Sequence, residues 1–313
     1  HRLGANEAPP AIISIFLGAE LEKLFEAIES GEGDPHTPAS FLDLGASVLP
    51  PLPMHGGDRN RTSPFAFTGN KFEFRAVGSS APIYWPQTVL NVAVAESLKQ
   101  LADELDGLEP GDFEGLTTIL SRAVREHKRV LFEGNGYSEE WHAEAARRGL
   151  PNNRSTVEAL PALETAKAKT LFSSFGVLSE RELASRVDIA WEHYVKVQNI
   201  EASCAVDMAR TMVLPAAAQY LGILAAAGAS KGVAAVADRV ADLVDRLVAA
   251  SDALEHARHV AHEAGTVPAE ARAFAEHVIP AQATLREIVD ELEGLVSDEL
   301  WPLPKYRELL FVY

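Results

Sequence analysis

The sequence predicts an α+β protein in which a short region of strands and loops precedes a long helical region. Residues 1–85 contain apolar and alternating runs that are interrupted by glycine and proline, a pattern typical of strands joined by loops. From Pro86 onward, apolar residues recur at intervals of three and four, which is the spacing of the buried face of a helix. We therefore expect strands first, followed by helices that pack against one another.

In the first region, residues 11–17 form an almost continuous apolar run, AIISIFL, and are expected to be a buried strand. Residues 19–29 have helical spacing, and residues 42–48 are expected to form another strand. The first region is thus expected to contain strands, loops and one helix.

In the second region, helices are expected over residues 87–105 and 113–132. Ser138, Ser155 and Ser179 are N-cap candidates, and the last two are followed three residues later by glutamate, the pattern of a capping box. Beyond residue 178, long helices with disturbances at Pro215 and Pro280 are expected over three ranges: residues 179–227, 230–263 and 268–295.

Residues 70–75, NKFEFR, alternate strictly between charged and aromatic side chains. A strand would place Lys71, Glu73 and Arg75 on one face, and Phe72 and Phe74 on the other face, toward the core. A carboxylate between two cations suits a metal ion held beside anionic oxygens, which is what phosphoryl transfer requires. A solvated sheet face is an equally good interpretation of these six residues alone.

The preceding loop favours the chemical interpretation of this strand. Residues 58–64, DRNRTSP, add two guanidinium groups close to the strand in sequence. Glycines at position 69 and position 78 bracket the strand with flexible backbone. These features predict a cationic pocket around one carboxylate.

Length and charge limit the classes of partner. A chain of 313 residues with 47% hydrophobic residues can bury a core in one large domain or two ordinary ones. The formal net charge of −17 opposes binding to nucleic acid or to an anionic membrane, although a local arginine cluster can still hold a small phosphate. Small anions and metal ions are therefore the expected partners.

The single cysteine, Cys204, excludes an intramolecular disulfide and suits a reducing cytoplasm. We expect Cys204 to be a buried helical thiol. The alanine-rich run of residues 213–227 is too short to span a bilayer and is interrupted by polar and helix-breaking residues. His256, His259 and His262 recur at steps of three, but their surroundings favour a polar helix surface over a metal site.

Five stretches of the chain carry a further signal: residues 1–10 (HRLGANEAPP), 60–75 (NRTSPFAFTGNKFEFR), 135–141 (NGYSEEW), 148–152 (RGLPN) and 301–306 (WPLPKY). Together they resemble the C-terminal half of the type III glutamine synthetases. The resemblance spans nearly the whole chain and is strongest in the first eighty residues.

The resemblance implies ATP-dependent joining of ammonia to glutamate through γ-glutamyl phosphate, with Mg²⁺ or Mn²⁺ at the site. It also implies a cytoplasmic enzyme that forms a large homo-oligomeric ring. Its implied roles are glutamate binding by Arg2 and Arg75, catalysis by Glu7 on a flap and by Arg61 at the transferring phosphate, a nucleotide-side cation at Lys71, and a metal ligand at Glu73.

The resemblance further implies a division into residues 1–110, the end of the catalytic domain, and residues 111–313, a helical C-terminal extension. Where better-known bacterial classes have another arginine, this chain has Ala66 and its neighbour Phe65, so one phosphate contact would come from elsewhere. The N-terminal half of the site precedes the flap in this family, and the chain begins at the flap. We therefore expect an enzyme fragment that is inactive alone. Two alternatives are a ligase of the same fold that joins glutamate to another amine, and a non-enzymatic assembly or regulatory module.

Overall fold

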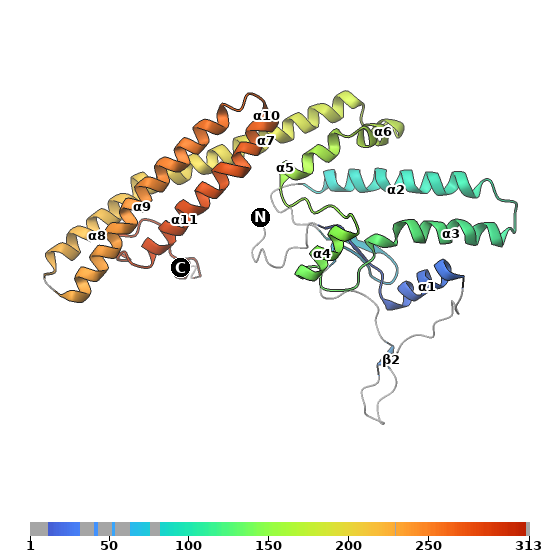
Figure 1. Ribbon diagram of the computed structural model, residues 1–313, viewed down its shortest axis with the longest axis horizontal. Helices are drawn as coiled ribbons and strands as arrows, with labels where there is room; N and C mark the ends of the chain where they lie inside the picture. Colours follow the sequence, from blue (N-terminus) through green and yellow to red (C-terminus); the bar gives the residue numbers. More distant parts are fainter. Residues whose placement is uncertain are drawn as a thin grey trace. The chain divides into compact units, whose positions relative to one another are not determined.

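The computed structural model describes residues 12–31, 41–42, 52–53, 63–75, 82–228 and 230–310 (Figure 1). The chain divides into two compact units. The first contains His1–Ser155 and Thr170–Val177, and the second contains Thr156–Lys169 and Leu178–Tyr313. This division lies well beyond residue 110, because α3 (Phe113–His127) packs on α1 (Ala19–Ser30) in the first unit. The family boundary at residue 110 stays a prediction.

A small three-stranded sheet lies in the first unit, in the order β1-β4-β5. Strand β1 (Ile15–Phe16) pairs in parallel with β4 (Phe65–Phe67), and β4 pairs antiparallel with β5 (Phe72–Phe74). On the other side of β1, Ile15 forms a parallel bridge with Leu131. The described part of the chain therefore confirms strands in the first region, combined with helices, as an α+β arrangement.

The strand predicted over residues 11–17 is wrong in length, because only Ile15 and Phe16 are strand among its described residues. Two further strands, β2 (Phe41–Leu42) and β3 (Leu52–Pro53), form a separate antiparallel pair. Most of the strand predicted over residues 42–48 lies outside the described residues. The helix predicted over residues 19–29 is confirmed as α1.

The aromatic face of the β4–β5 hairpin differs from its prediction. Phe72 and Phe74 are 49% and 38% exposed, so they do not lie in the core. Their rings contact Phe65, which lies across the hairpin, at centroid distances of 5.6 and 5.8 Å. The opposite face carries the fully buried Ala66, paired in register with Glu73. The predicted alternation is confirmed. However, the buried residue of the hairpin, Ala66, lies on the same face as the charged Glu73 and not on the aromatic face.

The other helices of the first unit follow the strands. Helix α2 (Tyr84–Leu105) and α3 confirm the first two helices predicted beyond Pro86, and a 3₁₀ turn (Lys128–Val130) extends α3. Helix α4 (Glu139–Arg147) begins at Ser138, whose Oγ accepts a hydrogen bond from Trp141 N–H at 3.2 Å. This confirms Ser138 as an N-cap.

Helix α4 ends in a Schellman motif that joins it to a small core. Leu150 N–H donates to Ala145 O at 2.9 Å, and Gly149 N–H donates to Ala146 O at 3.0 Å. Gly149 has φ of 69°, a left-handed conformation that glycine adopts without strain. Ala145 packs with Ile12 and Trp141, and Leu150 lies against this cluster. The motif thus fixes the end of α4 beside β1.

The second unit is helical and is built around α9 (Lys231–His262). One side of α9 contacts α7 (Glu180–Met208) and α8 (Leu214–Ala226), and another contacts α11 (Ile279–Glu293) (Figure 1). The buried side chains of α9 recur at the predicted spacing of three and four: Val240, Leu243, Leu247, Ser251, Leu254 and Ala261. Shorter elements complete the chain: α5 (Thr156–Ala159), a 3₁₀ segment (Leu160–Glu164), α6 (Ala166–Ser174), α10 (Val267–Ala273) and α12 (Tyr306–Leu309).

The disturbances predicted at Pro215 and Pro280 are π-helical segments. Ala209–Val213 joins α7 to α8, and Phe274–Val278 joins α10 to α11. Each proline is the second residue of the helix that follows. Proline has no N–H to continue the α-helical ladder, and its ring crowds the carbonyl four residues earlier. A wider turn just before it relieves that crowding, since Leu214 N–H donates to Ala209 O, five residues back.

Ser179→Ala is expected to lower the free energy of unfolding by about 1 kcal/mol. Ser179 Oγ accepts from Glu182 N–H at 3.3 Å, and a Glu182 carboxylate oxygen accepts from Ser179 N–H at 2.8 Å, so the predicted capping box is confirmed. Chemical denaturation would measure the change. The matched control is Ser230→Ala, because Ser230 is the N-cap of α9 but its side chain makes no capping bond. Equal losses for the two variants would contradict the prediction.

Two smaller predictions for the helical region are wrong. Cys204 is exposed on α7. The spacing of three between Asp207 and Arg210 predicts an ion pair on the helix surface, but Arg210 instead contacts Asp252 and Glu255 of α9 at 2.7 and 2.6 Å. Within the described residues, none of the helices has the length and apolar content needed to cross a membrane.

Candidate functional site

Strand β5 brings three of the six predicted site residues together. Glu73 lies between its two neighbours on the same face: Arg75 Nη2 is 3.2 Å from one carboxylate oxygen, and Lys71 Nζ is 3.9 Å from the other. The Arg75 side chain is 16% exposed, whereas those of Glu73 and Lys71 are 42% and 66% exposed. Along the row formed by Lys71, Glu73 and Arg75, the exposed fraction of the side chain therefore decreases from an exposed lysine to a mostly buried arginine.

Three hydrogen bonds fix the hairpin that carries this row. Thr68 N–H donates to Lys71 O at 2.8 Å, closing a turn in which Gly69 has φ of 99°. Arg75 N–H donates to Pro64 O at 2.8 Å at the other end of the strand. Ser63 Oγ donates to Ser14 O at 3.2 Å and so ties the start of the hairpin to the segment that leads into β1. The backbone beneath Glu73 is thus held at both ends.

The chemistry open to this row follows from its charges. Arg75 can present guanidinium N–H groups to a carboxylate or phosphate, and Glu73 orients that guanidinium. The exposed carboxylate of Glu73 also fits a hard divalent cation as one oxygen ligand. Among the described residues, no group of three or more histidine, cysteine or acidic side chains is arranged to hold a metal ion. Glu73 would therefore contribute one ligand to a site completed by other groups.

The remaining predicted site residues are not placed by the structure. Arg2, Glu7 and Arg61 lie outside the described residues. Their predicted roles in glutamate binding, in the flap and at the transferring phosphate stay predictions.

Two of the histidines of α9, His259 and His262, contact polar neighbours. The two ring nitrogens of His262 lie 2.5 Å from Glu270 Oε1 and 3.1 Å from Asn199 Oδ1. His259 Nε2 lies 3.4 Å from Glu263 Oε1. The two side chains therefore have different polar partners.

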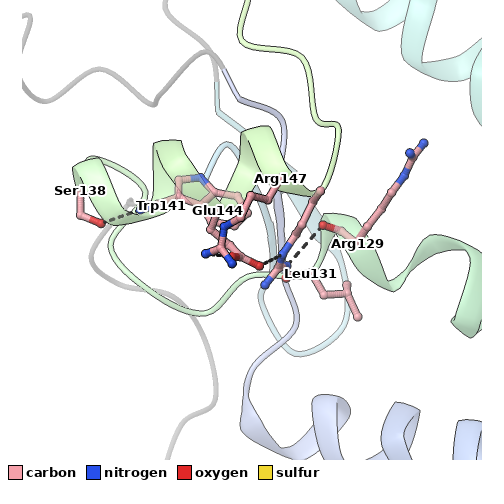
Figure 2. A network of polar contacts seen from close by, with 7 residues as sticks. Arg129, Leu131, Ser138, Trp141, Glu144 and Arg147 are labelled. Carbon is pink, nitrogen blue, oxygen red and sulfur yellow. Dashed lines mark hydrogen bonds and ion pairs between the residues drawn. The ribbon is translucent and has the colours of Figure 1, made fainter.

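A polar network on α4, which the sequence patterns did not single out, supports the edge of the sheet (Figure 2). Arg148 Nε donates to Glu144 Oε1 at 2.7 Å, and Arg148 Nη1 donates to Leu131 O at 2.8 Å. Arg147 forms a second ion pair with Glu144. The hydrogen bond from Arg148 lowers the pKa of Glu144, and the charge of Arg147 lowers it further. The spacing of four between Glu144 and Arg148 was the available signal.

A half-buried carboxyl group, Glu133, lies just after this edge. Burial raises the pKa of Glu133, and the negative charge of Glu22 raises it further, while a hydrogen bond from Gly18 N–H offsets part of the change. Glu133 Oε1 is buried and has no hydrogen-bond partner within the described residues. Nothing in the local sequence pattern indicated this group, because burial and the approach of α1 depend on tertiary structure.

Glu133→Gln is expected to raise the melting temperature at neutral pH. The pKa of Glu133 is higher in the folded than in the unfolded protein. Glu133 therefore stabilises the folded state fully at pH values below the ordinary carboxyl pKa, and this stabilisation is lost as the pH rises through the folded-state pKa. Glutamine does not ionise, so the variant does not lose this stability as the pH rises. Melting curves across pH should show the gain at neutral pH and its disappearance in acid. Glu140→Gln, at an exposed position of α4, is the control, and an equal decrease at every pH for Glu133→Gln would refute the prediction.

Comparison with known proteins identifies relatives over the whole chain. Residues 115–231 match the glutamine synthetase C-terminal domain. The chain is 40% identical to the type-3 glutamine synthetase of Dictyostelium discoideum over 330 residues, which covers 100% of this chain and 45% of that protein. It is 37% identical to a glutamine synthetase of Bacteroides fragilis, with 99% of this chain and 45% of the relative covered.

A third relative gives the same extent of similarity. The glutamine synthetase of Butyrivibrio fibrisolvens is 33% identical, with 99% of this chain and 46% of the relative covered. The chain thus spans about half the length of the relatives it matches. These matches place the chain in the glutamine synthetase family, as a relative of the C-terminal portion of the type III enzymes.

Proposed function

We propose that this chain forms part of an ATP-dependent ligase that joins ammonia to the γ-carboxylate of glutamate. The observation that carries the proposal is the row on β5, where Glu73 lies within ion-pair distance of both Lys71 and Arg75. Family membership supplies the reaction class, because the relatives are named glutamine synthetases. The row supplies charges of the kind that this reaction needs.

The reaction has two steps under this proposal. A γ-carboxylate oxygen of glutamate first bonds to the γ-phosphorus of ATP, and ADP leaves. Ammonia nitrogen then bonds to the carbonyl carbon of the γ-glutamyl phosphate, phosphate leaves, and the nitrogen loses a proton. Both steps concentrate negative charge on oxygen atoms, so fixed cations with well-placed N–H groups lower the barrier.

The described residues would contribute binding and orientation. Arg75 would bind a carboxylate of glutamate with its guanidinium, which the contact with Glu73 holds in place. Lys71, the most exposed of the three, would lie on the nucleotide side as a point charge. Glu73 would hold Mg²⁺ or Mn²⁺, which would neutralise phosphate charge when bound.

The residues outside the described part would complete the site in this proposal. Arg2 would assist Arg75 with glutamate, and Arg61 would contact the transferring phosphate. Glu7 would accept a proton from ammonium and shield the acyl phosphate from water. The chain spans about half the length of its relatives. We therefore propose that activity also requires the region that the relatives have and this sequence lacks. The complete enzyme would act as a homo-oligomeric ring in the cytoplasm.

The test is formation of γ-glutamyl hydroxamate from glutamate, hydroxylamine, ATP and Mg²⁺. The assay should use the complete gene product that contains this chain, with omission of ATP as the control. ATP-dependent product that ammonia suppresses by competition supports the proposal. Turnover with alkylamines but not with ammonia would establish the alternative amine ligase, and no turnover with any amine would refute a ligase role.

A further inference from the structure

Four polar side chains from three helices meet at the C-terminal end of α9. His262, the last residue of α9, has one ring nitrogen 2.5 Å from Glu270 Oε1 of α10 and the other 3.1 Å from Asn199 Oδ1 of α7. Arg258 Nε, one turn earlier on α9, donates a hydrogen bond to the same Asn199 oxygen at 3.1 Å. The His262 ring therefore links α7, α9 and α10 through polar contacts.

These contacts determine which ring nitrogens of His262 carry a proton. Arginine has no acceptor atom, so the Asn199 atom that faces Arg258 is the amide oxygen and not the amide nitrogen. The His262 nitrogen that faces this oxygen must therefore donate a hydrogen. The other ring nitrogen faces the Glu270 carboxylate, which also only accepts when it is ionised. The ring that satisfies both oxygens is the positively charged imidazolium.

The two helix ends favour the charges of this ion pair. Glu270 belongs to the first turn of α10, where the helix dipole favours an ionised carboxylate. His262 ends α9, where the helix dipole favours a cation. A hydrogen bond between two charged groups is also stronger than a neutral one. Each helix end therefore stabilises the charge that it carries.

The other groups that face the ring leave this balance in place. Helix α7 presents the neutral amide of Asn199, and the π-helical segment after α10 presents an aromatic ring at a centroid distance of 5.3 Å. On α9, Arg258 opposes a second positive charge, but it contacts the Asn199 oxygen and not the ring. Glu263, the next residue in sequence, adds a negative charge and contacts a neighbouring histidine. The direct contact with Glu270 dominates, because the energy between charges falls with distance.

We propose that His262 is a pH-dependent link, which holds α7, α9 and α10 together when its ring is charged and loses one of its contacts when the ring is neutral. A neutral ring has one N–H, so one nitrogen would present a lone pair to an oxygen. If the Asn199 amide rotates to donate to the ring, its NH₂ group faces Arg258, and that contact is lost instead.

The direction of the pH effect follows from the charge of the ring. Histidine changes its charge between about pH 5 and 8. The contribution of the charged ring to stability is therefore present in mild acid and is lost as the pH rises. We expect the loss to appear first as local opening of α10, which Glu270 joins to the ring. The proposal does not depend on the glutamine synthetase reaction.

Hydrogen–deuterium exchange of the complete gene product, read by mass spectrometry at pH 6 and pH 8, tests this link. Peptides covering residues 263–273 report the opening of α10, after correction of the rates for the intrinsic pH dependence of amide exchange. The corrected exchange of α10 should be about tenfold faster at pH 8, because a charge-assisted hydrogen bond is lost. The centre of α9, residues 240–251, should not change. An unchanged α10, or an equal rise in both segments, would overturn the proposal.

Variants assign the pH dependence to this ring. Glu270→Gln keeps the size of the side chain and can donate its amide hydrogen to a neutral ring, so the exchange of α10 should become nearly independent of pH. His262→Gln lacks the titrating group and should behave in the same way. His259→Gln is the matched control on the same helix, because this side chain is 75% exposed and contacts Glu263, and the variant should keep the wild-type dependence.

The two substitutions protect the test against a folding defect. Thermal melting of each variant confirms folding, and Glu270→Gln gives the answer if His262→Gln does not fold. A pH dependence of α10 exchange in Glu270→Gln equal to that of wild type would refute the proposal.

Discussion

Trp141→Ala is expected to lower the free energy of unfolding of the first unit by about 3–5 kcal/mol. Trp141 is 1% exposed, and its ring stacks on Phe132 with 3.7 Å between centroids. The guanidinium of Arg148 lies 5.3 Å from the same ring. Truncation removes the largest side chain of the cluster with Ile12 and leaves a cavity between α4 and the sheet.

Urea denaturation monitored by circular dichroism would measure this loss. Phe113→Ala is the matched control, because Phe113 is 76% exposed and its truncation should change stability by less than about 1 kcal/mol. A Trp141→Phe variant, which keeps a stacking ring, should recover part of the loss. Similar values for Trp141→Ala and Phe113→Ala would contradict the packing described for α4.

Glu73→Gln is expected to lower kcat/KM for glutamine formation by at least about 100-fold. The substitution keeps the size of the side chain but removes the charge that pairs with Lys71 and Arg75. Arg75 then loses the partner that orients its guanidinium, and the divalent cation loses a charged oxygen ligand. Stability should change little, because the Glu73 side chain is 42% exposed.

A metal titration separates the two contributions of Glu73. If Glu73 is a ligand, the variant should require a higher Mg²⁺ concentration for half-maximal activity than wild type. Glu140→Gln, with an exposed carboxylate on α4, should leave both the activity and the metal requirement unchanged. Wild-type turnover by Glu73→Gln would remove Glu73 from the proposed site.

Much of the helical region could be predicted from local signals. The capping box at Ser179 and the repeat along α9 depend on residues three and four positions apart, which lie next to each other on one helix. The prolines at positions 215 and 280 act on the turn just before them, so their effects were also predictable. The row on β5 followed from strand alternation alone.

The errors concern features that depend on distant parts of the chain. Alternation separated Phe72 from Glu73 but could not show that the aromatic face would be half-exposed. Cys204 has helical neighbours that suit burial, yet its position on α7 faces away from the packed side. Arg210 has two nearby acids on α9, about forty residues later, so sequence proximity favoured the wrong partner.

The hydrogen bond from Arg148 to Leu131 O also protects one edge of the sheet. Leu131 lies beside Ile15, and Phe132 N–H donates to Ile15 O at 3.0 Å. The N–H of Leu131 is used by Lys128 O, and its carbonyl accepts from Arg148. A strand from another molecule would need these same two groups to extend the ladder. An arginine side chain therefore closes this edge to intermolecular strand addition, a recognised route to aggregation.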